Sequence, residues 1–395
     1  MIRGIPRSES GRRSSRLVLA VIAGLVVAGA GLTALAAAKP LHSSVAITFK
    51  HGKPSTFAGT RFDGEYVASL KRVYFLGFRD INNATDGSIW YYDTVAKTYT
   101  DTGLDMPVPV SNYGIAALTD SRGLGLYIFG GRDDAGNIVT NVQAYYPDTN
   151  TTRQFTHDPW PGTTPAGCVS LPAMGVAVAN NTAVVMGGLS FSANGCADDQ
   201  SAQTWLFDPT AGNGLRWTQG RDLKVARGYI TPAVIGKKIY AIGGDTNDAG
   251  SLIPQQTVEA ATLGRGWNDG NFADLPEACD ESQAFAFRTG PLANTITLAG
   301  CGQWPNAVPD VLQYDVAGDA WSIVGALNDN RRNHAGASIG SSARPKLYIL
   351  GGYGEDSGFI DPISTSEIGQ PAAAGGSPSA PAAPHSPSGA KPSTS

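Results

Sequence analysis

Several features that point to common functions are missing from this chain of 395 residues. Residues 1–16 contain five arginines and one glutamate, so the rest of the chain is more acidic than the formal net charge of −4. Nucleic-acid binding needs a basic stripe, and the sequence has none. The four cysteines form no C-x-x-C pair, and no EF-hand loop occurs, which argues against the common zinc and calcium sites.

Long apolar runs are also scarce, and the one that exists lies at the N-terminus. Residues 17–38 are uncharged and mostly apolar, enough for a membrane-spanning helix of about 20 residues. The basic n-region 1–16 predicts a cytosolic N-terminus and export of everything that follows. A-x-A sites such as 34–36 leave a cleaved signal peptide open. We favour a single-pass anchor over secretion, with an extracytoplasmic protein in either case.

The cysteines of an exported chain are expected to be oxidised. Cys168 and Cys196 bracket one glycine-rich segment, and Cys279 and Cys301 bracket another in nearly the same way. The sequence therefore predicts two local disulfides, Cys168–Cys196 and Cys279–Cys301.

What the chain has in quantity is glycine, 49 residues in all, and part of it belongs to a repeat. An apolar strand of the type GLYIFGG, with one or two glycines at its end, occurs six times at intervals of just over 50 residues. The copies are 72–78, 125–131, 182–188, 238–244, 295–301 and 346–352. Periods near fifty indicate stacked repeats.

The segments between copies repeat as well. An apolar strand precedes each copy, and in most units a strand ending in an aromatic-Asp pair and a shorter strand with one large aromatic follow. Four strands per unit predict one blade of a propeller. The sixth unit lacks its last strand, and 45–52 has strand composition. We therefore predict an all-β, six-bladed propeller that this N-terminal strand closes in the last blade.

The pattern over residues 45–368 resembles the kelch-repeat family. The diglycine strands, the Tyr-Asp turns, the outer tryptophans and the segment RRNHAGASIG at 331–340 carry the resemblance. Gly77-Phe78 and Gly300-Cys301 depart from the diglycine pair.

Copper radical oxidases of the galactose oxidase type share this propeller, so the resemblance raises a copper oxidase as a possible function. Those enzymes need two histidines, two tyrosines and an adjacent Tyr-His pair, and this chain has no Tyr-His dipeptide. His334 is expected to be structural. We predict no metal, no cofactor and no catalytic residues. A carbohydrate-active enzyme, similar to galactose oxidase or to a kelch-type sialic-acid mutarotase, is the alternative.

The loops after the glycine motifs are rich in Asp, Asn and Gly, with interleaved aromatics. Such loops share one face of a propeller and suit a hydroxyl-rich ligand, although ordinary solvated turns have the same composition. We expect a binding or recognition module for an extracellular protein or glycan. The candidate ligand-binding residues are Arg79, Asp80, Arg132, Asp133, Asp245, Trp304 and Tyr353.

Two further features concern the surface of an exported protein. Asn83, Asn150 and Asn180 head N-x-[ST] sequons, which are glycosylation sites if the host modifies secreted proteins. The tail 370–395, rich in Pro, Ala, Ser and Gly, is predicted to be disordered because it cannot bury enough apolar surface.

Overall fold

The computed structural model describes residues 44–249, 251–267, 272–303, 306–354 and 362–372. The chain divides into two units, 1–39 and 40–395, and the first lies wholly outside the described residues. The predicted anchor and most of the predicted tail are therefore not described. Among the described residues, no helix is long and apolar enough to span a membrane.

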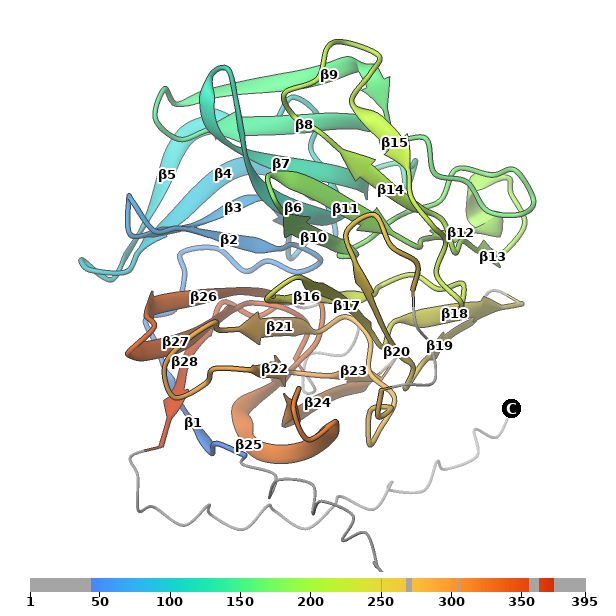
Figure 1. Ribbon diagram of the computed structural model, residues 1–395. Coiled ribbons are helices and arrows are strands. Elements are labelled where there is room, and N and C mark those ends of the chain that lie inside the picture. Colours follow the sequence, from blue (N-terminus) through green and yellow to red (C-terminus); the bar gives the residue numbers. More distant parts are fainter. Residues whose placement is uncertain (1–43, 250, 268–271, 304–305, 355–361, 373–395) are drawn as a thin grey trace, which may run out of the picture. The chain divides into compact units, whose positions relative to one another are not determined.

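The second unit is a six-bladed β-propeller, which confirms the predicted fold (Figure 1). The first blade consists of β2 (Gly64–Val67), β3 (Arg72–Arg79), β4 (Thr85–Asp93) and β5 (Thr98–Asp105). The second consists of β6 (Ser111–Asp120), β7 (Gly123–Arg132), β8 (Asn141–Tyr146) and β9 (Thr151–Pro159). In both blades the strands pair antiparallel in chain order.

The next two blades carry additions on their loops. The third blade contains β10 (Val176–Ala179), β11 (Thr182–Met186), β14 (Thr204–Phe207) and β15 (Trp217–Gln219). The described strands of the fourth sheet are β16 (Thr231–Ile235), β17 (Lys238–Ile242) and β20 (Val258–Thr262). Two small ribbons extend from these blades, formed by β12 (Leu189–Ser190) with β13 (Asp199–Gln200), and by β18 (Asp245–Asp248) with β19 (Ser251–Pro254). A short 3-10 helix, η1 (Ser192–Asn194), lies inside the first ribbon's loop.

The last two blades complete the circle. The fifth contains β21 (Gln283–Ala286), β22 (Thr295–Ala299), β24 (Asn306–Asp315) and β25 (Ala320–Arg331), with the short β23 (Gly302–Gln303) beside β24. The sixth contains β26 (Ala335–Ser341), β27 (Arg344–Leu350), β28 (Ser366–Pro371) and the N-terminal β1 (Ile47–His51). The innermost strands β2, β6, β10, β16, β21 and β26 contact one another in that cyclic order.

The N-terminal strand closes the propeller as predicted. β1 pairs antiparallel with β28, from Ile47 opposite Pro371 to His51 opposite Glu367. In Figure 1, β1 in blue accordingly lies beside β28 in red. Phe49 is buried against Gly369, where a Cβ would lie 2.5 Å from the phenyl ring. Its side chain thus takes the outer-strand aromatic position, and the first and last segments are held together.

The repeated glycine is explained by its backbone conformation. The first glycine of the motif has a positive φ in all six blades, including Gly77 and Gly300, where the second glycine is replaced. A Cβ at Gly187 or Gly243 would also lie 2.1 Å from a carbonyl oxygen in the next blade. The neighbouring blade's backbone fills this space. The second glycine also has a positive φ in the four blades that keep it, but only the first position is glycine with a positive φ in all six, so the two departures preserve the repeat.

The arginine of the RRNHAGASIG segment is structural. Arg331 is fully buried, donates to the carbonyl oxygens of Gly351 and Thr365, and forms an ion pair with Glu367 at 3.0 Å. Arg227 of the fourth blade repeats the arrangement with Glu259. These buried pairs fix the loop-side ends of their blades, because removing either partner would leave an uncompensated charge.

Candidate functional site

A ring of six backbone positions defines one end of the propeller. Each lies at or just before the start of an innermost strand, and each is a non-glycine residue with φ between 46° and 60°. Such residues are uncommon, and strained backbone positions cluster at ligand sites. The six, which we call the mouth ring, are Arg61, Asn112, Met174, Tyr229, Glu281 and Asn333.

Backbone hydrogen bonds link successive members of the mouth ring. The amide of Asn112 donates to Arg61 O at 2.6 Å, and the amide of Arg61 donates to Asn333 O at 2.8 Å. The amide of Asn333 in turn donates to Glu281 O at 2.9 Å. These bonds bring four members of the ring, from distant sequence segments, to the same end of the central channel, and the Asn112 side chain donates to Tyr229 Oη at 3.1 Å.

One side of this mouth is cationic. Arg61, Arg79, Arg132 and Tyr353 line a cavity of about 470 Å³, which we call the arginine pocket. Its other lining residues are Asn83, Asp134, Ala135 and Gly136. Arg61 comes from the mouth ring. Arg79, Arg132 and Tyr353 each come directly after a copy of the glycine motif, which ends the second strand of a blade. The repeat geometry therefore gathers three arginines from two adjacent blades.

Hydrogen bonds fix the buried guanidinium of Arg79. Its Nε donates to Ser111 Oγ at 3.2 Å, and its Nη1 donates to Asn83 O at 2.6 Å. Burial lowers the pKa of Arg79, and repulsion from Arg61 and Arg132 lowers it further. The shift shows that the three cations act on one another, so an anion placed among them would relieve the repulsion.

The other two arginines lie over aromatic rings. The Arg61 guanidinium is 5.6 Å from the centroid of Tyr353, and that of Arg132 is 4.9 Å from the centroid of Phe191. Within the described ranges, none of the three pocket arginines forms an ion pair with a carboxylate. Asp134 lies at the pocket edge, where its carboxylate accepts the Thr85 amide at 3.0 Å.

The acidic side of the mouth adjoins the arginine pocket, because the Arg332 guanidinium lies 4.8 Å from the centroid of the Tyr353 ring, and its charges are internally balanced. Glu281 accepts from Arg332 Nη1 at 2.7 Å, and both side chains are buried. Burial raises the pKa of Asp245 far above its ordinary value, and repulsion and a hydrogen bond from Asp280 add to the effect. The Asp245–Asp280 pair therefore retains a proton near neutral pH, which lowers the negative charge on this side.

Two more carboxyl groups lie in the central channel. Asp63 and Glu65 of the first blade, with Gln283 and residues from other innermost strands, line a cavity of about 250 Å³. Burial raises the pKa of Asp63 to about 7. Burial and then repulsion from Asp63 raise the pKa of Glu65 to about 8. Both groups can therefore hold protons near neutrality.

The structure brings together some of the predicted ligand-binding residues and separates others. Arg79, Arg132 and Tyr353 share the arginine pocket. Asp80 and Asp133 instead accept hydrogen bonds from amides of their own loops and form no ion pair with the preceding arginine in the described part of the chain. These are structural Asx turns.

The remaining predicted positions are Asp245 and Trp304. Asp245 is fully buried on the acidic side of the mouth. Trp304 lies outside the described residues. Arg61 was not predicted from sequence, although its place just before an innermost strand, repeated in every blade, was a usable signal.

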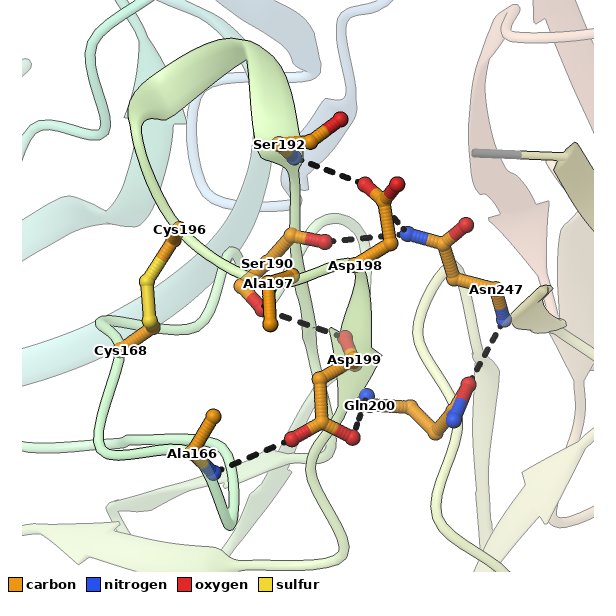
Figure 2. Close-up of a disulfide and its surroundings, with 10 residues drawn as sticks. All are labelled: Ala166, Cys168, Ser190, Ser192, Cys196, Ala197, Asp198, Asp199, Gln200 and Asn247. Carbon is orange, nitrogen blue, oxygen red and sulfur yellow. Dashed lines mark hydrogen bonds between the residues drawn. A yellow bond between two sulfur atoms is a disulfide. The ribbon is translucent and has the colours of Figure 1, made fainter. Parts of the chain in front are cut away.

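The two disulfides form as predicted, Cys168 with Cys196 and Cys279 with Cys301. Figure 2 shows the first, which joins the loop before β10 to the loop between β12 and β13. Cys279 and Cys301 are buried in the core between the fourth and fifth blades, whereas Cys168 and Cys196 are partly exposed. The bonds are in keeping with an oxidising, extracytoplasmic location.

Histidine placement gives no metal site among the described residues. No group of three His, Cys, Asp or Glu side chains in that part of the chain could hold a metal ion. His334 is fully buried, and burial followed by repulsion from Arg331 lowers its pKa to about 3. A Cβ at Gly352 would lie 2.8 Å from His334 Cβ. His334 therefore packs as a neutral structural side chain.

The predicted sequon asparagines are all exposed. Asn83 lines the arginine pocket, whereas Asn150 and Asn180 lie in turns between strands elsewhere in the first half of the propeller. Glycosylation of Asn83 remains a prediction, and a glycan there would stand at the pocket's edge.

The fold and repeat define the chain as a kelch-repeat β-propeller. No family model matches it. It is similar to β-scruin of Limulus polyphemus, with 29% identity over 156 residues, and to α-scruin of the same species, with 27% identity over 184 residues. These matches cover 39% and 44% of this chain, and only 15% and 17% of the two scruins. The solved structure of YjhT superposes with a TM-score of 0.59 and 15% identity, covering 80% of this chain and 95% of YjhT.

Proposed function

We propose that this protein is a non-catalytic, extracytoplasmic binding module that recognises a carboxylated glycan through the arginine pocket. The observation that carries the proposal is the grouping of Arg61, Arg79 and Arg132 around one cavity with no carboxylate ion pair among the described residues. Three clustered cations with one carboxylate, Asp134, at the cavity edge leave an excess of positive charge, which a negatively charged ligand would balance.

The chemistry of the lining fits a sugar acid. Guanidinium groups bind carboxylates through paired, charge-assisted hydrogen bonds, which fix orientation as well as affinity. Asn83 adds an exposed amide at the same cavity, and amides bind hydroxyl groups. Tyr353 is buried beneath the guanidinium groups of Arg61 and Arg332 and serves to position Arg61. A cavity of about 470 Å³ accommodates one or two sugar residues rather than a protein interface.

The proposed location rests on the apolar segment 17–38 and on the two disulfides. We infer that the propeller lies outside the cytoplasm, held by residues 17–38 with the N-terminus inside. An anchored propeller would present its mouth to glycans or glycosylated proteins outside the membrane.

A second candidate is a carbohydrate-active enzyme. One observation favours it, the pair Asp63 and Glu65 in the channel, because carboxyl groups with pKa values of about 7 and 8 could exchange protons at neutral pH. Asp63→Asn with Glu65→Gln separates the two candidates. A binding module keeps its affinity in this variant, and an enzyme loses turnover of the bound sugar.

The proposal is tested on a glycan array that holds uronic-acid glycans beside neutral glycans of the same size. We expect the wild-type propeller to bind the carboxylated set, and Arg61→Met to lose that signal. Equal signals on neutral and carboxylated glycans, or full binding by Arg61→Met, would refute the arginine pocket as the ligand site.

A further inference from the structure

The loop between β12 and β13 reaches from the third blade toward the arginine pocket. This segment, residues 191–198, is called the strap. Residues 192–195 are exposed, and η1 buries no side chain, so the strap has little packing of its own. Its position depends on tethers at its ends and tip.

Two tethers hold the strap to separate parts of the propeller, and a third contact closes it internally, as Figure 2 shows. The Cys168–Cys196 disulfide joins it to the loop before β10. The Asn247 side chain donates to Ser190 O at 3.0 Å and thereby ties its start to the ribbon of the fourth blade. Asp198 accepts the Ser192 amide at 2.7 Å, which closes the strap on itself.

The strap also contacts two residues that line the arginine pocket. The guanidinium of Arg132 lies 4.9 Å from the centroid of the Phe191 ring. At the tip, Asn194 Nδ2 donates to Gly136 O at 3.1 Å. Arg132 Nε donates to the same carbonyl at 3.5 Å. In the described part of the chain, the cation–π contact and the hydrogen bond of the Arg132 guanidinium thus involve the strap or the carbonyl that the strap holds.

We propose that Phe191, held by the Cys168–Cys196 disulfide, is a positioning residue that orients Arg132 in the arginine pocket. Arg132 lacks a carboxylate partner in the described part of the chain, so a cation–π contact of about 0.5–1 kcal/mol is a substantial part of what fixes it. The aromatic ring in turn packs on the apolar cluster that includes Leu189 and Tyr229. The ligand role of Arg132 rests on the proposed function, whereas its orientation by Phe191 does not.

The two disulfides differ in what they control. Cys279 and Cys301 are both fully buried in a core cluster, so their loss acts on folding. Cys168 and Cys196 belong to partly exposed loops, and the strap is the segment that their bond restrains. The Cys168–Cys196 bond is therefore the one expected to act on the pocket without unfolding the blades.

Orientation of Arg132 can be measured without any ligand. The full-length protein is labelled with phenylglyoxal, which modifies arginine, and mass spectrometry follows Arg132, Arg79 and Arg61 separately. Phe191→Ala and the double variant Cys168→Ser, Cys196→Ser are expected to speed labelling of Arg132 about two- to fivefold, the equivalent of one exposed cation–π contact. Phe191→Tyr, which keeps an aromatic ring, is expected to leave Arg132 labelling at the wild-type rate. Leu252→Ala, which removes another side chain from the same apolar cluster, leaves it unchanged.

Titration of the same proteins with D-glucuronate separates this inference from the proposed function. Affinity is expected to fall about two- to fivefold in both variants that speed labelling and to stay normal in Phe191→Tyr. Unchanged Arg132 labelling in Phe191→Ala and in the double cysteine variant overturns the positioning role. Faster labelling with no wild-type binding of glucuronate or of other sugar acids supports the positioning role and counts against the proposed function.

Discussion

Two neighbouring groups of charges at the propeller mouth are balanced in different ways. On the acidic side, Glu281 is paired with Arg332, and the pKa of Asp245 is raised beside Asp280, so the pair retains a proton and part of the negative charge is balanced within the fold. On the cationic side, Arg61 and its two neighbours have no carboxylate ion pair in the described ranges. The difference indicates that charged side chains in ion pairs stabilise the fold, whereas arginines without an ion pair can bind a ligand of opposite charge.

The largest expected effect comes from breaking the acidic side. Arg332→Met leaves Glu281 buried without its partner, which should lower the free energy of unfolding by about 3–5 kcal/mol. Arg61→Met, the matched change on the cationic side, should alter it by about 0.5 kcal/mol or less. Urea denaturation measures the free energy of unfolding of both variants. Equal losses in the two would contradict the difference between the acidic and the cationic side.

Ligand affinity should show the reverse order. Arg61→Met removes one charge-assisted contact and should weaken binding of D-glucuronate about 10- to 100-fold. Arg122→Met is the control, because it removes the same charge from an exposed hairpin outside the pocket. Fluorescence titration gives the affinities. Similar losses in the two variants would mean that net charge, rather than the pocket, attracts the ligand.

Stability should fall as the pH rises through the range in which the channel carboxyls ionise. Asp63 and Glu65 have folded pKa values of about 7 and 8, above their ordinary values of 3.8 and 4.5. The folded state therefore holds more protons than the unfolded state between about pH 5 and pH 8, and stability decreases across that interval. The midpoint of thermal unfolding should drop by a few degrees. Asp63→Asn with Glu65→Gln should flatten this slope, and an unchanged slope would contradict the raised pKa values.

The smallest effect is expected for Asp245→Asn. The Asp245 carboxyl is already protonated at neutral pH because burial and Asp280 raise its pKa, so an amide of similar shape should cost about 1 kcal/mol or less. Urea denaturation at neutral pH measures the change. A loss as large as that of Arg332→Met would show that Asp245 is ionised in the folded protein.

Much of the fold could be predicted because the sequence repeats it. The first motif glycine needs a positive φ in every blade, including Gly77 and Gly300, and this local requirement is visible as a fixed spacing. Closure by β1 was predictable because the sixth unit lacked a strand and 45–52 supplied one. Local disulfide pairing was visible for the same reason, since each cysteine pair brackets one motif.

The candidate site was predicted only in part, because side-chain direction in loops does not follow from composition. Arg79 and Arg132 reach the pocket, whereas Asp80 and Asp133 turn back to their own loop amides. Arg61 joins them from the segment before β2, which a pattern limited to the loops after the glycine motif does not include. Pairing across blades, such as Arg332 with Glu281, likewise depends on the folded geometry.

The central claim is that the unpaired arginines bind a carboxylate, and calorimetric titration of the wild-type protein tests it most directly. D-glucuronate and D-glucose, which differ in the carboxylate, are titrated at low and high salt. The account predicts heat of binding for glucuronate, weakened by salt because screening reduces the attraction of the three cations, and no binding of glucose. Glucose binding of equal affinity, or glucuronate binding that does not respond to salt, would contradict it.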